Sequence, residues 1–600
     1  MSYINNRKLQ LLILLILAFG VYFNTTFNEY TLDDEAVITG NRLVKKGIDG
    51  IPSLVSHHLF YGSSEHNPGL SSGLYRPLPL TTFALEYEIF GKAPHISHLL
   101  NVILFCLIVL ALYLWMEKKF HQARYIPLIC AALFAIHPIH TEAIANIKGR
   151  DELLSLLFIL ITLLNFHWYN QWKKSKYLAF SMMAYIMALF SKESSVTFVG
   201  LLFISNWFLD KKTFRECFIH SIPFIIVTSI YLIIKFKVTG LTFESELSIL
   251  NYPYLYATAE EAFATKIYIL FKYIGLLLFP HPLTYDYCFN HIPYIKLSDV
   301  KFIISAIALT GLLTFAIYKL PGRNIYSFAI FFFFISIFLV SNLIFRIGAP
   351  MGERFLFLPS VAFCIAGGFM FSHFLVSGSK TVRTICISTL LIIFSAASFK
   401  TISRNSDWKN NLTLFTKDVE TAPNSIRTLT NAGAYSYYQL AHKAKTKEEE
   451  LKLRNYSIEK LKRAIATDSS FSEPYIHLAH ILFKNEDTDA AIACLVNAKN
   501  NAIKNSRLDI YFKEAAYRLN KKGLEDFKSG NLEEAQRKFL FALELDPSNA
   551  DSHWYAGGIH LERKEITETL KYWNKTLELN PDYPNGKLLL ETVKRDFNVK

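Results

Sequence analysis

Two adjacent acidic residues, Asp33 and Asp34, follow the first apolar run of the chain. That run, 9–28, carries no charge and is long enough to cross about 30 Å of hydrocarbon. A carboxylate at the mouth of a membrane span can act as a general base that accepts the proton of an attacking hydroxyl group. Its neighbour would orient the acceptor or a cation. The pair could also cap a short helix that starts near Ala36, because Asp is a favoured N-cap residue.

A second charged region follows the third apolar run. His137 and His140 could suggest a metal, but a proline separates them and no third ligand is evident, so a metal site is disfavoured. Arg150 fits better as a bidentate partner of a lipid phosphate. The alternative for Arg150 is an ion pair with Asp151 or Glu142 that fixes the turn.

Two further charged motifs break or border apolar runs. Lys192 and Glu193 separate two apolar stretches of only about 15 residues, and short broken spans often mark binding sites within membranes. Glu353 and Arg354 open another apolar run. Charges at membrane depth are expensive, so these residues are functional candidates.

Composition places the chain among membrane proteins. Of its 600 residues, 52% are hydrophobic and 50 are Phe, which excludes an ordinary soluble protein. The apolar residues fill blocks up to about residue 400, and a charged, Ala-rich segment follows. The net charge of +13 lies largely in short loops, so no nucleic-acid partner is expected. The seven cysteines show neither metal-ligand spacing nor a disulfide framework.

The apolar runs predict eleven membrane spans with the N-terminus inside and the C-terminus outside. They are 9–28, 96–116, 125–141, 153–172, 177–191, 194–209, 218–234, 302–318, 325–345, 355–376 and 384–399. Basic clusters fall at alternate turns, which the positive-inside rule places in the cytoplasm. The run 267–280 is interpreted as a re-entrant or interfacial helix on the outer side, because it is short and a proline ends it. The large loop 29–95 and the charged motifs then face outward.

A 34-residue period marks the C-terminal part of the chain. The matched pairs are Gly523 and Gly557, Ala535 and Thr569, Phe539 and Trp573, Ala542 and Thr576, and Pro547 and Pro581. This is the tetratricopeptide (TPR) period, and TPR arrays bind peptides or partner proteins. Weaker units lie upstream, one of them divided by a charged insert at 443–454. We expect a membrane domain at 1–400, a linker at 401–423 and a TPR domain of three to four repeats at 424–600.

Familiar signatures of soluble enzymes do not occur in this sequence. It contains no phosphate-cradling Gly loop, no metal-ligand pattern and no Ser-His-Asp signature. Nucleotide hydrolysis and zinc chemistry therefore have no support, and the charged outer-face motifs remain as the candidates for chemistry.

Taken in order, the motifs resemble the transmembrane and TPR-repeat-containing O-mannosyltransferase family of the GT-C glycosyltransferases. The matching segments are Leu32-Asp33-Asp34, Tyr75–Leu78, His95–Asn101, His137–Ala143, Gly149-Arg150, Ser191–Glu193, Glu353–Ser360 and Arg404–Trp408. The resemblance covers nearly the whole chain, and the ordered set is specific although each motif alone is weak. Vertebrate members usually have longer repeat arrays, and a bacterial relative fits this chain.

The resemblance implies an all-α protein, a polytopic GT-C membrane domain followed by a TPR solenoid. It implies inverting transfer of a sugar, often mannose, from a polyprenyl-phosphate donor to Ser or Thr hydroxyls of a protein on the non-cytoplasmic side. Asp33 or Asp34 would be the base, and Arg150, Lys192, Arg354 and Arg76 would hold the phosphate, whose developing charge needs fixed cations. Supporting roles would fall to His137, His140, Glu142, Glu193 and Glu353.

The same resemblance gives the expected surroundings. The lipid-linked sugar is a co-substrate, a divalent cation is possible, and the TPR domain would present the protein acceptor. The membrane would be a bacterial inner membrane, or the endoplasmic reticulum in a eukaryote, with the TPR domain periplasmic or lumenal. Two other functions stay open. One is an oligosaccharide ligase or polymerase of the envelope, and the other is a non-enzymatic TPR scaffold.

Overall fold

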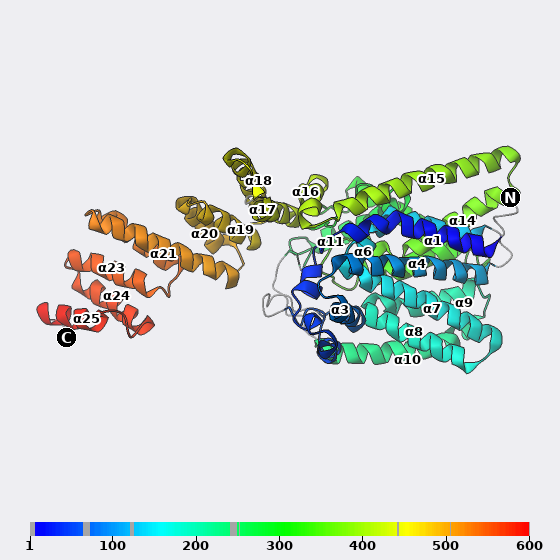
Figure 1. The fold of residues 1–600 in the computed structure, drawn as a ribbon, viewed down its shortest axis with the longest axis horizontal. Helices are drawn as coiled ribbons and strands as arrows, with labels where there is room; N and C mark the ends of the chain where they lie inside the picture. The colour runs from blue at the N-terminus through cyan, green and yellow to red at the C-terminus, as the bar shows by residue number, and fades with distance from the viewer. Residues whose placement is uncertain are drawn as a thin grey trace. The chain divides into compact units, whose positions relative to one another are not determined.

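Helices and the loops between them make up the whole part of the chain that the structure describes. The computed structural model describes residues 6–63, 73–120, 125–240, 249–250, 252–440, 443–503 and 506–598, and no β-strand occurs in these ranges. The expected all-α class is therefore confirmed. The chain forms two compact units, Met1–Pro423 and Asn424–Lys600 (Figure 1).

The first unit is a bundle of long apolar helices. They are α1 (Arg7–Tyr22), α4 (Pro94–Lys119), α5 (Ile126–Ile136), α7 (Arg150–Trp172), α8 (Ser175–Ser191), α9 (Phe198–Phe208), α10 (Phe214–Thr239), α11 (Ala259–Leu278), α12 (Val300–Tyr318), α13 (Ile325–Ile337), α14 (Ser360–Ser377) and α15 (Lys380–Asp407). Helix α7 packs against α4 and α8, and α4 also packs against α1 and α5 (Figure 1).

Fewer of these helices are long enough to cross a membrane than the eleven spans predicted. Seven described helices have the length and apolar composition of a span, or eight if the bent pair of α5 and α6 (Thr141–Ala145) counts as one. Helices α8, α9 and α13 are shorter, with 17, 11 and 13 residues. At 1.5 Å per residue, even the longest of the three falls short of about 30 Å.

Helix α11 is longer than the interfacial segment predicted at 267–280. It begins at Ala259, after the N-cap residue Thr258, which forms a capping box with Glu261, and it runs for 20 residues. Two acidic residues in the first turn explain why the hydropathy pattern identified only its second half. The helix is not among the apolar helices long enough to span.

The loop after α1 folds on a small core of its own. It contains η3 (Glu35–Thr39), η4 (Val44–Gly50), α2 (Ile51–Ser56) and α3 (Pro77–Phe90). The buried side chains of this core are Val37, Ile38, Leu43, Val44, Leu54, Leu59, Leu80, Phe83 and Ala84, joined by Ile147 from the start of α7. This packing fixes the acidic pair against the N-terminal end of α7.

Residues 401–423, predicted to be a linker, are helical instead. They form the end of α15 and the short helix α16 (Asn411–Thr421), and both belong to the first unit. Arg404 of α15 binds Asp418 of α16 through two hydrogen bonds of 2.6 and 2.7 Å, and both residues are buried. A buried bidentate pair of this kind holds the two helices together.

The second unit is a stack of helix pairs. They are α17 (Ile426–Leu440) and α18 (Lys447–Thr467), α19 (Glu473–Lys484) and α20 (Thr488–Asn501), α21 (Ser506–Lys528) and α22 (Leu532–Leu545), and α23 (Ala550–Glu562) and α24 (Ile566–Leu579), followed by α25 (Gly586–Asp596). Most of the charged insert forms the first turns of α18. A Cβ on Gly523 would lie 2.6 Å from Phe539, and one on Gly557 2.5 Å from Trp573. The predicted repeats are confirmed by these pairs.

Candidate functional site

The two acidic residues of the first loop have different environments. Asp34 is fully buried, and its carboxyl accepts backbone hydrogen bonds from Thr31 at 2.9 Å and Lys148 at 2.7 Å. Burial is the main reason that the pKa of Asp34 rises to about 7. The side chain of Asp33 is half exposed. Asp34 is therefore placed to fix the turn, and Asp33 is the carboxylate that an acceptor can reach.

Lys148 is the cation next to the exposed carboxylate. Its Nζ lies 3.8 Å from Asp33 and 3.6 Å from Asp151, both longer than a close ion pair, and its side chain is mostly buried. A cation held loosely between two carboxylates can exchange one of them for a phosphate. Lys148 stands in the same charged motif as Arg150, but the sequence contains no local signal that places it beside Asp33.

Arg76 joins the loop to two other elements. At the start of α3, it binds Asp151 at 2.5 Å and holds both oxygens of Glu193, with distances of 2.8 and 2.5 Å. Burial disfavours the charged guanidinium, but the two carboxylates outweigh it and raise the pKa of Arg76. Arg76 therefore fixes these carboxylates in place, and its three hydrogen bonds leave little of its guanidinium for a phosphate.

Lys192 lies close to the same cluster. Its Nζ forms an ion pair with Glu152 and lies 5.7 Å from the centre of the Phe355 ring. Electrostatic interactions also connect it with Asp151 and Arg76. Residues from three separate motifs therefore meet at the N-terminal end of α7.

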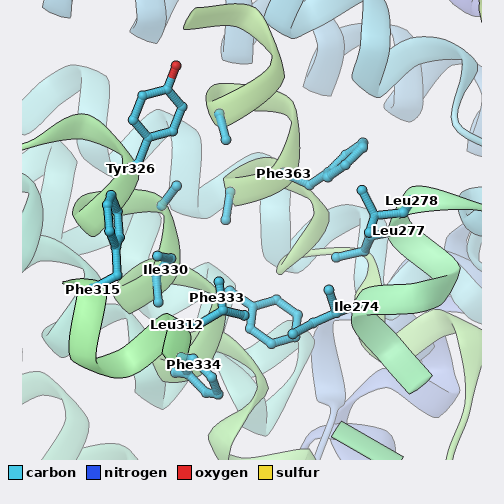
Figure 2. Close-up of a pocket in the computed structure, with 13 residues that line it drawn as sticks. Ile274, Leu277, Leu278, Leu312, Phe315, Tyr326, Ile330, Phe333, Phe334 and Phe363 are labelled. Atoms are coloured by element: carbon cyan, nitrogen blue, oxygen red, sulfur yellow. The ribbon is translucent and has the colours of Figure 1, made fainter. Parts of the chain in front are cut away.

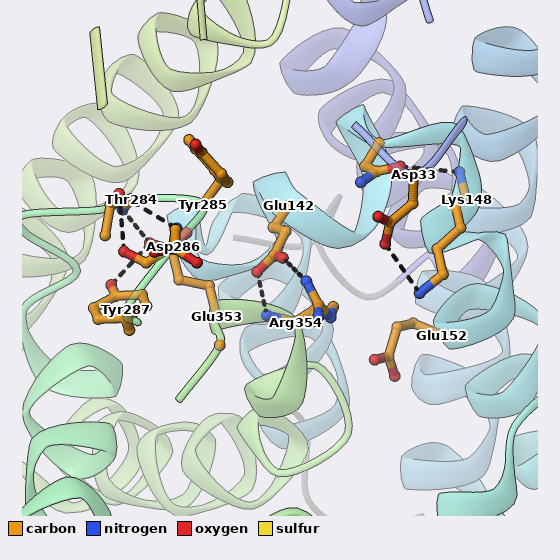
Figure 3. A network of polar contacts seen from close by, with 12 residues as sticks. Asp33, Glu142, Lys148, Glu152, Thr284, Tyr285, Asp286, Tyr287, Glu353 and Arg354 are labelled. Carbon is orange, nitrogen blue, oxygen red and sulfur yellow. Dashed lines mark hydrogen bonds and ion pairs between the residues drawn. The ribbon is translucent and has the colours of Figure 1, made fainter. Parts of the chain in front are cut away.

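Arg354 lies on the other side of this region. Its guanidinium binds Glu142, and its backbone N–H donates to the other Glu142 oxygen at 2.8 Å (Figure 3). The Arg354 side chain remains 28% exposed, the most of the four predicted phosphate-binding cations. Burial opposes its charge, but Glu142 and Asp33 outweigh burial and raise the pKa of Arg354. The exposed base candidate and Arg354 thus share one electrostatic environment.

Glu353 points away from Arg354 and holds the segment 284–287. Its Oε1 accepts hydrogen bonds from the backbone N–H of Thr284 at 2.5 Å and from the Tyr287 hydroxyl at 3.0 Å (Figure 3). Glu353 is fully buried, and burial raises the pKa of Glu353 to about 8. The backbone N–H of Tyr285 donates to Asp418 at 2.6 Å. The carboxyl groups of Glu353 and Asp418 therefore hold the segment 284–287 beside the turn that carries Arg354.

Arg150, expected to bind phosphate, is instead enclosed by the protein. It is 2% exposed and donates to Glu86 at 2.7 Å, to Asn101 at 2.8 Å and to the Ser97 carbonyl at 3.1 Å. The Phe83 ring covers its guanidinium. Arg150 in this arrangement anchors α3 and α4 to α7, and its ion-pair partner is Glu86 rather than the Asp151 or Glu142 suggested by the sequence.

The two histidines lie in the packed core of the bundle. His137 binds the Leu277 carbonyl at 3.0 Å, and His140 lies 2.8 Å from the Ser360 hydroxyl. The rings of Phe134 and Phe357 surround His140. These contacts give both histidines a packing role. No group of three or more His, Cys, Asp or Glu residues that could hold a metal occurs among the described residues.

An apolar groove lies between the helices α11 to α14. It has a volume of about 380 Å³ and is lined by Ile274, Leu277, Leu278, Leu312, Phe315, Tyr326, Ala329, Ile330, Phe333, Phe334, Ala362, Phe363 and Ala366 (Figure 2). Leu277 is also the residue whose carbonyl binds His137. The groove is the kind of surface that accepts hydrocarbon.

Curated relatives identify the class of protein that the chain resembles. No family model matches it. It is 27% identical to the human protein O-mannosyl-transferase TMTC3 over 97% of this chain and 69% of that protein. It is 27% identical to the protein O-mannosyl-transferase F38B6.6 of Caenorhabditis elegans and 26% identical to human TMTC1. Those alignments cover 70% and 68% of this chain, and 59% and 50% of the relatives.

The resemblance inferred from the motifs is therefore confirmed. The chain spans between about half and two thirds of the length of these relatives. Among solved structures it is similar to the Archaeoglobus fulgidus oligosaccharyltransferase, with a TM-score of 0.37 and 12% identity over 75% of this chain and 59% of that chain. It is also similar to the TPR protein YrrB, with a TM-score of 0.19 and 18% identity over 34% of this chain and 91% of that chain. Its apolar helices and its relatives define a multi-pass membrane protein.

Proposed function

We propose that this chain is a membrane glycosyltransferase that moves a sugar from a polyprenyl-phosphate donor to Ser or Thr hydroxyls of a protein. The supporting observation is that Asp33, half exposed, stands beside Lys148 and in the electrostatic range of Arg354. The names of the relatives make mannose the first sugar to test.

The proposed reaction inverts the sugar's anomeric carbon. The Asp33 carboxylate takes the proton of the acceptor hydroxyl, and the hydroxyl oxygen forms a bond to the anomeric carbon. The bond from that carbon to the phosphate oxygen breaks, and its electron pair stays on the phosphate. Lys148 and Arg354 stabilise this growing charge, with Lys192 nearby. Asp34, Arg76 and Glu142 hold these groups in position.

The apolar groove suits the hydrocarbon part of such a donor. Its lining is almost wholly apolar, and it lies among helices of the bundle that carries Arg354. In this proposal the polyprenyl chain occupies the groove while its phosphate reaches the outer-face cations. Because the polyprenyl chain already lies in lipid, it would be held in the groove by van der Waals packing rather than by removal of apolar surface from water.

The two units divide the work in this proposal. Residues 1–423 form the catalytic GT-C unit, and 424–600 form a TPR unit that selects the protein acceptor. Alternating basic turns support an outer, periplasmic or lumenal position for the charged cluster and for the TPR unit. A bacterial inner membrane is the proposed location.

Purified protein in lipid vesicles provides the test. The vesicles receive a panel of polyprenyl-phosphate sugars and a Ser/Thr peptide, and wild type is compared with Asp33→Asn. Asp49→Asn, an exposed acid of the same loop, is the matched control. The proposal predicts transfer by wild type and the control, and loss in Asp33→Asn. Equal transfer by all three proteins excludes Asp33 as the base. No transfer from any donor favours a ligase with another substrate or a TPR scaffold.

A further inference from the structure

A second cavity lies at the turn that carries the acidic pair. It has a volume of about 220 Å³ and is lined by Tyr30, Thr31, Leu32, Glu35, Thr39, Lys92 and Asn411. None of the cations assigned to the donor phosphate lines it. The cavity is therefore separate from the cation cluster, although it shares the short turn that bears Asp33.

Hydrogen bonds between distant segments build this cavity. The Leu32 N–H donates to Asn411 at 2.7 Å, and the Glu29 N–H donates to the Lys409 carbonyl at 2.8 Å. The segment that carries Lys92 also contacts the segment 29–32, because the His98 ring binds the Glu29 carbonyl at 3.2 Å. The cavity is thus preformed by three parts of the chain.

The backbone at the cavity is also unusual. Leu32 has a φ of +50°, a left-handed conformation that non-glycine residues rarely adopt. The hydrogen bond to Asn411 holds it there. Strained residues held by their surroundings concentrate at functional sites. In this chain the strained residue lines the cavity and directly precedes Asp33 in the sequence.

Two charges in the cavity lack protein partners. Glu35 and Lys92 are both exposed, and neither forms an ion pair with any residue that the structure describes. The charged groups of the neighbouring cluster are all paired, so these two differ from it. An unpaired acid and an unpaired base lining one small cavity suit a ligand that carries charged side chains.

We propose that this cavity reads the residues flanking the acceptor Ser or Thr in a polypeptide substrate. Lys92 contacts an acidic flanking side chain and Glu35 a basic one, while the hydroxyl reaches Asp33. The inference rests on the proposed function, because it supplies the acceptor side of that reaction. In this inference the membrane unit and the TPR unit both select the acceptor, whereas the proposed function alone gives selection to the TPR unit.

Binding of labelled peptides to the full-length protein in lipid nanodiscs tests this inference without requiring catalysis. The peptides share one Ser/Thr core and differ only in acidic or basic flanking residues. Lys92→Gln should weaken binding of the peptide with acidic flanking residues, and Glu35→Gln should weaken binding of the peptide with basic ones. The expected loss is roughly two- to fivefold, the size of one partly exposed ion pair. Lys46→Gln and Asp49→Asn, exposed residues of the same loop outside the cavity, should leave both affinities unchanged.

Transfer kinetics with the same peptides separate the two proposals. A selective rise in KM at unchanged kcat, in the matching variant only, supports the cavity as an acceptor site. Normal transfer by wild type with equal peptide affinities in all variants overturns the cavity assignment and leaves the proposed function standing. Charge-selective binding without transfer to any peptide supports the cavity and contradicts the proposed function.

Discussion

The backbone N–H of Lys148 donates a hydrogen bond of 2.7 Å to the buried carboxyl of Asp34. This bond joins the loop after α1 to the short helix η7 (Ile147–Gly149) just before α7, residues that are 114 positions apart in the sequence. Through it, Asp34 fixes the position from which the Lys148 side chain reaches Asp33. The acidic pair thus contains one positioning carboxyl and one available carboxylate.

Asparagine substitutions should separate these roles. Asp33→Asn removes the proposed base and should lower kcat by about 10²- to 10⁴-fold at an unchanged Tm. Asp34→Asn retains one acceptor oxygen for two backbone N–H groups, so it should lose about 1–3 kcal/mol of unfolding free energy. Transfer assays and thermal unfolding of both variants check this. A stable Asp34→Asn protein would contradict the positioning role.

Lys148 should act on the donor. Lys148→Met removes the cation between Asp33 and Asp151 while keeping its length, and we expect a loss of about tenfold or more in kcat/KM for the lipid-linked sugar. Lys148→Arg keeps the positive charge and should recover part of the lost kcat/KM. Steady-state kinetics with varied donor give the measurement, with Lys46→Met as the control. If Lys148→Met has wild-type kinetics, the phosphate contact lies elsewhere.

Arg150 should affect stability more than donor binding. Arg150→Met leaves Glu86 buried without its partner, and breaking such a pair costs about 3–5 kcal/mol. The double variant Arg150→Met/Glu86→Leu removes both charges and should recover much of this loss. Thermal unfolding in detergent measures the effect. A donor KM raised in Arg150→Met at an unchanged Tm would instead restore the phosphate-binding role predicted from the sequence.

Glu353 should make stability depend on pH. The folded-state pKa of Glu353 is about 8, above its unfolded value near 4.5, so the folded protein keeps this proton to higher pH. The resulting stability is present below about pH 4.5 and is lost as the pH rises through 8. Glu353→Gln keeps the acceptor oxygen for Thr284 and Tyr287 and does not ionise. Between pH 5 and pH 9, its Tm should therefore fall less than that of wild type, and equal falls would contradict this assignment.

Adjacent glycines in the last repeat provide a matched pair. A Cβ on Gly557 would lie 2.5 Å from the Trp573 ring, whereas one on Gly558 would meet nothing within 4 Å. Gly557→Ala should destabilise the TPR unit by about 1–3 kcal/mol through overpacking. Gly558→Ala should stabilise it by up to about 1 kcal/mol through helix propensity. Limited proteolysis of the full chain reports on both, and equal cleavage rates would contradict the crossing geometry.

Local patterns in the sequence predicted much of the fold. A helix occupies at least part of each apolar run, and the 34-residue period located the helix pairs that Gly523 and Gly557 allow to cross closely. Both signals depend on residues near one another in the chain. The number of spans was predicted less well, because α8 and α9 have only 17 and 11 residues and are too short to cross a membrane, although both were counted as spans.

The arrangement of the site was harder to predict. The charged motifs do meet, but the pairing of Arg76 with Glu193 and of Arg150 with Glu86 joins residues 117 and 64 positions apart. Nothing local in the sequence determines which carboxylate a buried arginine meets. Lys148 was not selected for the same reason, since only the fold shows that its ion pairs are long.

The hydrogen bond from Leu32 to Asn411 joins residues 379 positions apart. A ribosome therefore synthesises the acidic turn early and the helix that supports it only after the last apolar helix of the bundle, α15. Until α16 has been synthesised, the turn lacks Asn411, the partner that holds the left-handed residue Leu32. Newly made chains would then reach the membrane without a formed acceptor cavity, and sugar transfer could begin only when synthesis of the membrane unit is complete.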